Sequence, residues 1–226
     1  MNALVNTLAF LVFPYLMLTA FVVGHSYRYL TDRFDWNAKS SELFDKESLK
    51  FGIFLFHWGM IFTFLGHFFG LLIPQWLLDR VGITAEIHDF VAINTGRLFG
   101  LVTLIGLLML FRRRVTNSRV RSVGSINDLV VLVALAFVVF FGTYNTFFAR
   151  YDVLYSIAPW IRSIVTFTPD PDLMLPVPWS YKIHILGAFA VFGFSPFSRL
   201  VHIWSVPVTY LFRPYLSFRR RAAGMP

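Results

Sequence analysis

Five long apolar segments, separated by short polar stretches, dominate the pattern of hydrophobic and polar positions along the chain. Each reaches the roughly 20 residues that a helix needs to cross the ~30 Å hydrocarbon core of a bilayer. None alternates as a barrel strand does, and backbone in lipid must satisfy its own hydrogen bonds, so each segment is expected to be a helix. The predicted spans are residues 3–24, 51–78, 90–111, 128–149 and 181–206. The pattern therefore predicts an all-α integral membrane bundle of five transmembrane helices, with residues 1–226 forming a single domain.

Basic residues are distributed unevenly over the segments between these spans. With Arg97 and Lys182 left aside as residues inside or at the edge of spans, the successive exposed segments hold none, five, one, five, two and five Lys or Arg residues. Because cytoplasmic loops are enriched in Lys and Arg, this alternation predicts an N-terminus outside and a C-terminus in the cytoplasm. The same three juxtamembrane clusters account for the net charge of +8 and argue against nucleic acid as a partner. They are expected to meet inner-leaflet lipid or a cytoplasmic partner.

The composition agrees with a chain that is solvated by lipid. Hydrophobic residues make up 57% of it and charged residues 14%, whereas soluble proteins carry about 25% charged residues. Cysteine is absent, which excludes thiolate-ligated iron–sulfur clusters, covalently attached c-type haem and disulfides in this chain. The polar stretch over residues 150–180 contains five prolines and is expected to be an extended outer-face segment with a short interfacial helix near residues 157–167.

Four of the six histidines lie on only two of the predicted spans. His57 and His67 fall in the second span, and His184 and His202 fall in the fifth. A single neutral imidazole in a membrane bundle can simply bridge two helices through a hydrogen bond. Four on two helices favour a functional site instead, because ionisable residues within spans are rare.

The spacing of these four histidines predicts two pairs. Ten residues of helix separate His57 from His67 by about 15 Å. Eighteen residues, which make five full turns, separate His184 from His202 by about 27 Å on one helix face. The predicted topology makes the two spans antiparallel, so His57 is expected to meet His202 toward the inner side. His67 is then expected to meet His184 toward the outer side.

Two imidazoles on facing helices are suitable axial ligands for a haem iron. The sequence therefore predicts two haem b groups with irons roughly 20 Å apart, the unequal spacings being absorbed by helix tilt, haem tilt or a kink at Pro196. A di-metal site would need nearby carboxylates, and neither span contains Asp or Glu. Zinc would need ligands within a few Å of one another, which these helical spacings forbid.

Haem propionates need cationic or hydrogen-bonding partners. Arg199 lies three residues before His202 on a nearby helical face, so it is predicted to contact the propionates of the inner haem. The alternative is an arginine that only snorkels to the interface. His25, at the inner end of the first span, is expected to have a structural or propionate-contacting role rather than to ligate iron.

Two long motifs, LFHWGMIFTFLGHFFGLLIP at 55–74 and FSPFSRLVHIWSVPVTYL at 194–211, resemble the gamma subunit of membrane-bound respiratory nitrate reductase, a di-haem cytochrome b. The resemblance extends over nearly the whole chain and includes GHSYRY, NAKSSELFDK and the RVR before the fourth span. It implies a multi-pass protein of the inner membrane that oxidises quinol at the outer haem. Electrons would pass through both haems to an iron–sulfur beta subunit and then to a molybdenum-containing alpha subunit that reduces nitrate.

The resemblance also implies which histidines serve which haem. His57 and His202 would ligate the haem nearer the cytoplasmic partner, and the other pair would ligate the haem nearer the outer face. The quinol site is expected beside that outer haem, where a free ring nitrogen of His67 could hydrogen-bond a quinone oxygen and Gly66 would leave space for the ring. His88, in the short loop that precedes the third span, is a second candidate for proton transfer. The alternative for His88 is a solvated loop histidine.

Two other functions remain open at this point. Related di-haem cytochromes serve sulfite-reductase-associated and heterodisulfide-reductase-like complexes, and the sequence does not name the terminal electron acceptor. A proton or ion transporter that uses buried histidines as a relay is the alternative from another class. The lack of acidic residues in the second and fifth spans, and of a visible inverted repeat, argues against the transporter.

Overall fold

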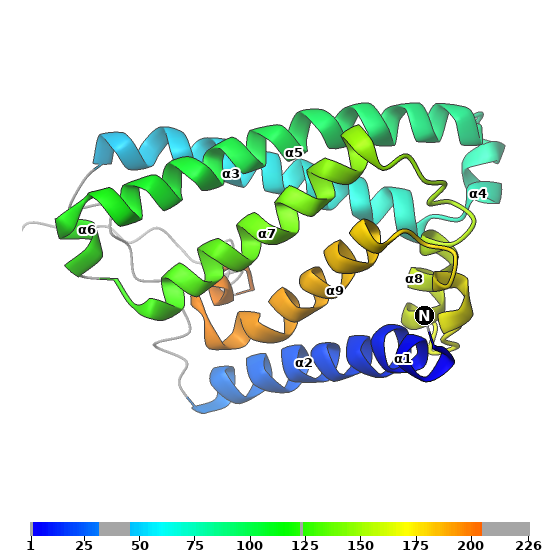
Figure 1. The fold of residues 1–226 in the computed structure, drawn as a ribbon, viewed down its shortest axis with the longest axis horizontal. Helices are drawn as coiled ribbons and strands as arrows, with labels where there is room; N and C mark the ends of the chain where they lie inside the picture. The colour runs from blue at the N-terminus through cyan, green and yellow to red at the C-terminus, as the bar shows by residue number, and fades with distance from the viewer. Residues whose placement is uncertain (1, 32–45, 123, 205–226) are drawn as a thin grey trace, which may run out of the picture.

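The computed structural model describes residues 2–31, 46–122 and 124–204, with no account of the side chains of residues 46–48 (Figure 1). Over these ranges the regular structure is entirely helical and contains no strand, which confirms the all-α prediction for the described chain. The α-helices are α1 (Ala3–Thr7), α2 (Phe13–Thr31), α3 (Lys46–His67), α4 (Gln75–Arg80), α5 (Ala85–Thr116), α6 (Ser118–Ser122), α7 (Ile126–Phe148), α8 (Ile157–Val165) and α9 (Trp179–Phe194). Turns of π-helix at Leu8–Val12 and Phe68–Leu72 join α1 to α2 and extend α3.

Four helical stretches are long and apolar enough to cross a membrane. They are Ala3–Thr31, Leu49–Leu72, Ala85–Thr116 and Ile126–Phe148. They correspond to the first four predicted spans, and they make the chain a multi-pass membrane protein. The second stretch ends at Leu72, earlier than the predicted residue 78, because a proline at position 74 holds Ile73 in an extended conformation.

The prediction of one continuous helix over residues 181–206 is wrong. Helix α9 ends at Phe194 after 16 residues, or about 24 Å of rise. The chain then forms a 3₁₀ turn at Ser195–Phe197, because Pro196 lacks an amide hydrogen and its ring would clash in a continuing α-helix. A second 3₁₀ helix follows at Arg199–Ile203, and residues 205 and 206 lie outside the described ranges. The count of five spans therefore stays a prediction.

The long helices pack in the order α3, α5, α7, α9, α2, so that α9, late in the chain, lies against α2 near its beginning (Figure 1). Helices α3 and α5 approach most closely at glycines. A Cβ placed on Gly106 of α5 would lie only 2.5 Å from the backbone nitrogen of Phe56, and one on Gly59 of α3 would lie 2.8 Å from the backbone nitrogen of Thr103. Glycine at these positions therefore sets the separation of the two helices, as is common in membrane bundles.

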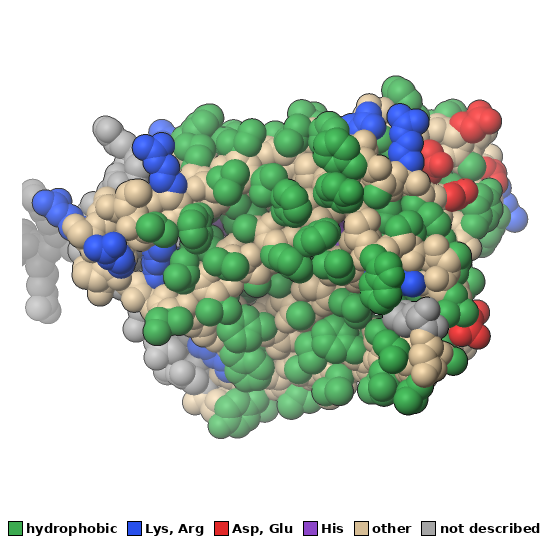
Figure 2. Space-filling model, viewed as in Figure 1, with side chains coloured by type: hydrophobic (Ala, Val, Ile, Leu, Met, Phe, Trp, Pro, Cys, Tyr) green, Lys and Arg blue, Asp and Glu red, His purple; other side chains and the backbone are tan. Residues whose placement is uncertain are grey.

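The two ends of the bundle differ in charge. Figure 2 shows hydrophobic side chains over the middle of the molecule. On this face the α6 end carries Lys and Arg side chains, whereas the opposite end carries Asp and Glu side chains beside further Lys and Arg side chains. This distribution is the one expected if the α6 end faces the cytoplasm, and the orientation remains a prediction. The helix predicted near residues 157–167 is α8, at the acidic end. Its Trp160 is fully buried and donates a hydrogen bond from Nε1 to the carbonyl of Phe10 at 2.9 Å.

Candidate functional site

The structure brings the four span histidines together in the two pairs expected from the sequence. The ring centres of His57 on α3 and His202 on the second 3₁₀ helix are 6.1 Å apart. The ring centres of His67, the last residue of α3, and His184 on α9 are 5.9 Å apart. Each pair therefore joins α3 to the α9 side of the bundle, one nearer the α6 end and one nearer the α4 end.

The break at Pro196 explains how both pairs form in one molecule. His184 and His202 do not share a continuous helix, so the predicted 27 Å rise between them does not apply. A kink at Pro196 was one of the three ways expected to absorb the unequal spacing. The structure has a full break there instead of a kink, and the chain after α9 turns so that the centre of the His202 ring lies 6.1 Å from that of the His57 ring on α3.

All four rings present the same nitrogen for ligation. The Nδ1 atom lies within hydrogen-bonding distance of a backbone carbonyl in every case: 2.9 Å for His57 to Ile53, 2.7 Å for His67 to Thr63, 2.8 Å for His184 to Val138 and 2.5 Å for His202 to Arg199. A carbonyl can only accept, so Nδ1 carries the proton and Nε2 keeps its lone pair. This is the arrangement that orients a metal-ligating histidine and fixes its tautomer.

The distance between the paired rings fits a shared metal. With ring bonds of about 1.3 Å, the atoms of an imidazole lie roughly 1.1 Å from its centre. With a metal–nitrogen bond of about 2 Å on each side, two rings on one metal have centres roughly 6 Å apart. The described residues contain no group of three or more His, Cys, Asp or Glu side chains that could hold a bare ion. Two imidazoles per site therefore suit a haem, whose porphyrin supplies the other iron ligands.

Helix α7 shapes the position of His184, and the sequence analysis did not single out its contribution. A Cβ placed on Gly142 would lie 2.7 Å from Cε1 of His184, so only glycine leaves room for the ring there. Val138, one turn earlier on the same face, supplies the carbonyl that accepts from Nδ1. The available signal was a lone glycine in the bulky run VVFFGTY, but nothing in the sequence showed which helix it faces.

The predicted quinol residues are placed as follows. Gly66 is exposed, and a Cβ placed on it would meet nothing within 4 Å. His88 belongs to the first turns of α5 rather than to a loop, because Thr84 caps that helix and starts it earlier than expected. Its Nε2 would lie 3.4 Å from a Cβ on Gly70, which is one turn after Gly66 on the same face of α3 and its π-helical extension.

His67 and His88 differ in how many ring nitrogens they have available to hydrogen-bond a quinol. His67 donates from Nδ1 to the Thr63 carbonyl, so a metal on Nε2 would leave this ring no nitrogen for a quinone oxygen, and its contact with quinol stays a prediction. Both ring nitrogens of His88 are buried and make no hydrogen bond to the described residues, and the Asp89 carboxylate, 3.7 Å from Nδ1, is too far away for one. His88 is therefore the described side chain with hydrogen-bonding capacity to spare beside Gly70.

Arg199 and His25, the residues considered as contacts for the inner haem propionates, both have partners within the protein. Arg199 forms an ion pair with Asp128 at the start of α7, with 2.9 Å between Nε and Oδ1. Its contact with a propionate stays a prediction. His25 lies 3.1 Å from the Ser195 hydroxyl through Nε2, which gives it a structural role at the end of α9.

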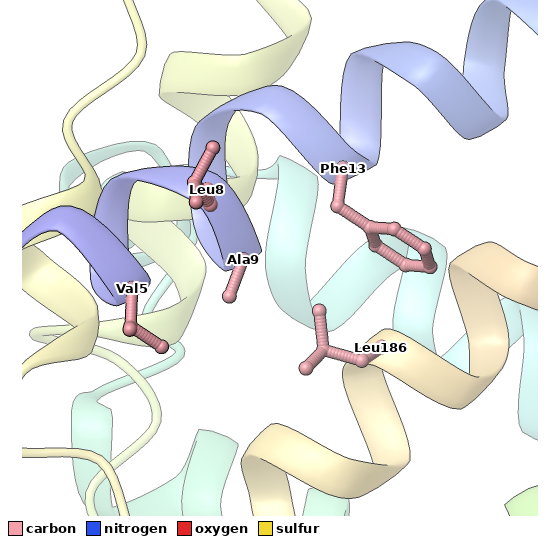
Figure 3. A pocket seen from close by; sticks show the side chains of 5 residues that line it. All are labelled: Val5, Leu8, Ala9, Phe13 and Leu186. Atoms are coloured by element: carbon pink, nitrogen blue, oxygen red, sulfur yellow. The ribbon is translucent and has the colours of Figure 1, made fainter.

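An apolar groove between the N-terminal helix and α9 is a separate feature (Figure 3). Figure 3 shows Val5, Leu8, Ala9 and Phe13 facing Leu186 across it. These side chains are hydrocarbon only, so they offer no hydrogen bond to a quinol oxygen. The groove is suited to apolar chains rather than to the polar head of a quinol.

Comparison with known protein families shows to which family the chain belongs. The family model for the nitrate reductase gamma subunit matches residues 6–221, which is almost the entire chain. The chain belongs to the nitrate reductase gamma subunit family. It is therefore the membrane cytochrome b subunit of an oxidoreductase complex, a haem-binding chain that works with other nitrate reductase subunits.

Individual relatives give the same assignment. The nitrate reductase gamma chain of Bacillus subtilis is 40% identical over 215 residues, which cover 93% of this chain and 96% of that one. The respiratory nitrate reductase 1 gamma chain of Escherichia coli is 32% identical over 221 residues, 96% of this chain and 98% of that one. A more distant relative is the Hdr-like menaquinol oxidoreductase cytochrome b-like subunit of Archaeoglobus profundus, 24% identical over 164 residues, 68% of this chain and 47% of that one.

Proposed function

We propose that this gamma subunit is the quinol-oxidising, di-haem subunit of a nitrate reductase in the inner membrane. His67 and His184 hold an outer haem b, and His57 and His202 hold an inner one. When bound, the two haems supply one-electron carriers between quinol at the outer face and an iron–sulfur beta subunit, which passes electrons to a molybdenum-containing alpha subunit for nitrate reduction. The observation that supports this most strongly is the pairing of the four rings, with ring centres 6.1 Å and 5.9 Å apart and Nδ1 of every ring hydrogen-bonded to a backbone carbonyl.

Hydrogen bonds within the protein hold these four rings in position. On α3, His57 and His67 donate to carbonyls of their own helix, four residues back. His184 donates instead to α7, so its orientation depends on the packing of α7 against α9. Because Nδ1 is the donor in each case, no ring has to change tautomer to ligate a metal through Nε2, which lowers the cost of binding.

Quinol oxidation at the outer face also requires a proton acceptor. Oxidation of quinol releases two protons, and each has to leave through a group within hydrogen-bonding reach. His88 has two unpaired ring nitrogens and lies beside Gly70, one turn beyond Gly66. It is the residue that we assign to hold a quinol hydroxyl and accept its proton, with Gly66 leaving space for the ring.

The proposal is tested by anaerobic spectroscopy on the purified complex. A soluble quinol analogue should produce the α-band of reduced haem b, and nitrate added afterwards should remove it. Reoxidation by sulfite or a heterodisulfide but not by nitrate would favour a complex like that of the archaeal relative, which is named as a menaquinol oxidoreductase subunit. A colourless chain with no α-band would contradict the proposal and favour a transporter.

Replacing His88 with leucine should lower kcat for quinol oxidation by the order of 100-fold, because a positioned proton acceptor contributes about that much. Leucine is close in size and removes both ring nitrogens, so haem content should stay at the wild-type value. Steady-state kinetics with a quinol analogue measures the effect. The control is Glu86→Gln, which neutralises another titratable group in the first turn of α5 and should leave kcat unchanged. An equal loss of kcat in both variants would show that His88 has no specific role in quinol oxidation.

Replacing Gly66 with alanine should raise the KM for quinol by about tenfold, equivalent to ~1.4 kcal/mol of binding. The new methyl group meets no other part of the described chain within 4 Å, so it should occupy only the space that we assign to quinol. Ala190→Val, which adds volume at an exposed position of α9, is the control and should leave KM unchanged. A wild-type KM in both variants would place the quinol ring elsewhere.

A further inference from the structure

The segment that carries His202 lies outside every long helix, so its position depends on contacts made by other elements. After Pro196 the chain has only short 3₁₀ turns, whose hydrogen bonds are fewer and poorer than those of an α-helix. On one side, Arg28 of α2 donates to the carbonyl of Pro196 at 2.8 Å. On the other side, the first turn of α7 meets the residues immediately before His202.

Two adjacent residues of α7 hold this segment. Asn127 donates from Nδ2 to the carbonyl of Phe197 at 2.7 Å. Asp128 lies 2.9 Å from Nε of Arg199 through Oδ1. One contact fixes the backbone before Ser198 and the other fixes the residue after it. The start of α7 therefore contacts the chain at Phe197 and Arg199, five and three residues before His202.

The Asp128 carboxylate is itself fixed on its second oxygen. Oδ2 accepts from Nη2 of Arg114, at the end of α5, at 2.5 Å and from the backbone amide of Ser125 at 3.1 Å. The Ser125 hydroxyl in turn accepts from the backbone amide of Asp128, which completes a capping box. One carboxylate, with its side chain only 14% exposed, thus ties together α5, α7 and the segment that holds Arg199.

Arg199 connects the Asp128 carboxylate to His202, because its side chain contacts Asp128 and its backbone carbonyl contacts the His202 ring. Its backbone carbonyl accepts the Nδ1 hydrogen of His202 at 2.5 Å. The other three paired histidines donate to carbonyls inside long helices, which the helix itself holds in place. Among the four, only the His202 ring donates to a carbonyl in a short 3₁₀ segment, so it is the ring that needs an additional support.

We propose that Asp128, assisted by Asn127, is the positioning residue for His202 and hence for the inner haem site. The inference rests on the proposed function, because it assigns a role at one of the two haem sites. Asp128 is a positioning residue and not itself a ligand of the haem iron. It acts through Arg199, by holding the carbonyl that sets the tautomer and direction of the His202 ring.

The experiment is a redox titration of the haem b absorption in the intact complex, with Asp128→Asn beside wild type. The inner haem is identified as the component missing in His202→Ala. In Asp128→Asn, either that component should be lost or its midpoint potential should rise, because two arginines lose the anion between them and the added positive field favours the reduced form. The outer component should keep its wild-type potential and stoichiometry, a pattern that a general loss of stability would not give.

The control is Asp79→Asn, which neutralises a carboxylate at the other end of the bundle that hydrogen-bonds to Gln75. It should leave both components unchanged. Asn127→Ala should change the inner component alone. If Asp128→Asn fails to assemble, this second variant tests whether the start of α7 positions His202. Equal changes in both components, or no change in the inner one, would overturn the inference. If wild type itself lacks two components, the proposed function fails instead.

Discussion

Replacing His184 with alanine should leave one haem b per chain instead of two and should abolish nitrate reduction driven by quinol. The substitution removes one of the two imidazoles of the outer pair, whose ring centres are 5.9 Å apart. Loss of groups that merely orient a metal ligand already costs about 10–100-fold in affinity, so loss of the ligand itself should exceed that. Haem extraction and spectroscopy measure the content, and stopped-flow reduction by quinol measures the rate.

The matched control is His88→Leu, which removes a histidine outside the two pairs. It should retain two haems per chain, although its quinol oxidation is slow. Nitrate reduction with an artificial donor to the partner subunits should also survive in His184→Ala, because nitrate chemistry takes place on another chain. Two haems in His184→Ala would show that this histidine is not a ligand.

Replacing Gly106 with alanine should destabilise the bundle by about 1–3 kcal/mol, the usual cost of overpacking a close contact. The added Cβ would lie 2.5 Å from the backbone nitrogen and 2.8 Å from Cα of Phe56, so α3 and α5 must move apart. Because Phe56 precedes His57, the displacement should also lower occupancy of the inner haem. Thermal unfolding in detergent, followed at the haem band and by circular dichroism, measures both effects.

Gly66→Ala is a matched control because it makes the same chemical change on α3, at a position with nothing within 4 Å of the new Cβ. Alanine forms helix better than glycine by about 1 kcal/mol, so this variant should unfold at the same or a slightly higher temperature. If both variants unfolded at the wild-type temperature, the close approach of α3 and α5 would not matter to stability.

The histidine pairs could be predicted from the sequence because the antiparallel direction of the two segments is enough to decide which histidine meets which, even though the predicted rise along the fifth span was wrong. The alternation of basic residues predicts this direction, and so sets His57 against His202 and His67 against His184. The break after α9 was harder to predict, since a proline inside a span can either kink a helix or end it. The structure shows that it ends here, and that two short turns carry His202 into place.

The supporting contacts could not be predicted because they join residues far apart in the sequence. Asp128 was read only as the edge of a span, yet it joins Arg114 to Arg199 across three elements. Gly142 contacts a ring 42 residues later in the chain. Likewise, the helical rise along α3 predicts how far His67 lies from His57, but it does not predict the hydrogen bond that Nδ1 of His67 makes to the Thr63 carbonyl.

Haem content in two double variants tests the pairing most directly. His67→Ala with His184→Ala removes both members of one pair, so the chain should retain one haem b. His57→Ala with His184→Ala removes one member of each pair, so the chain should retain none. One haem in the second variant and none in the first would contradict the account, because it would mean that His57 and His184 share an iron.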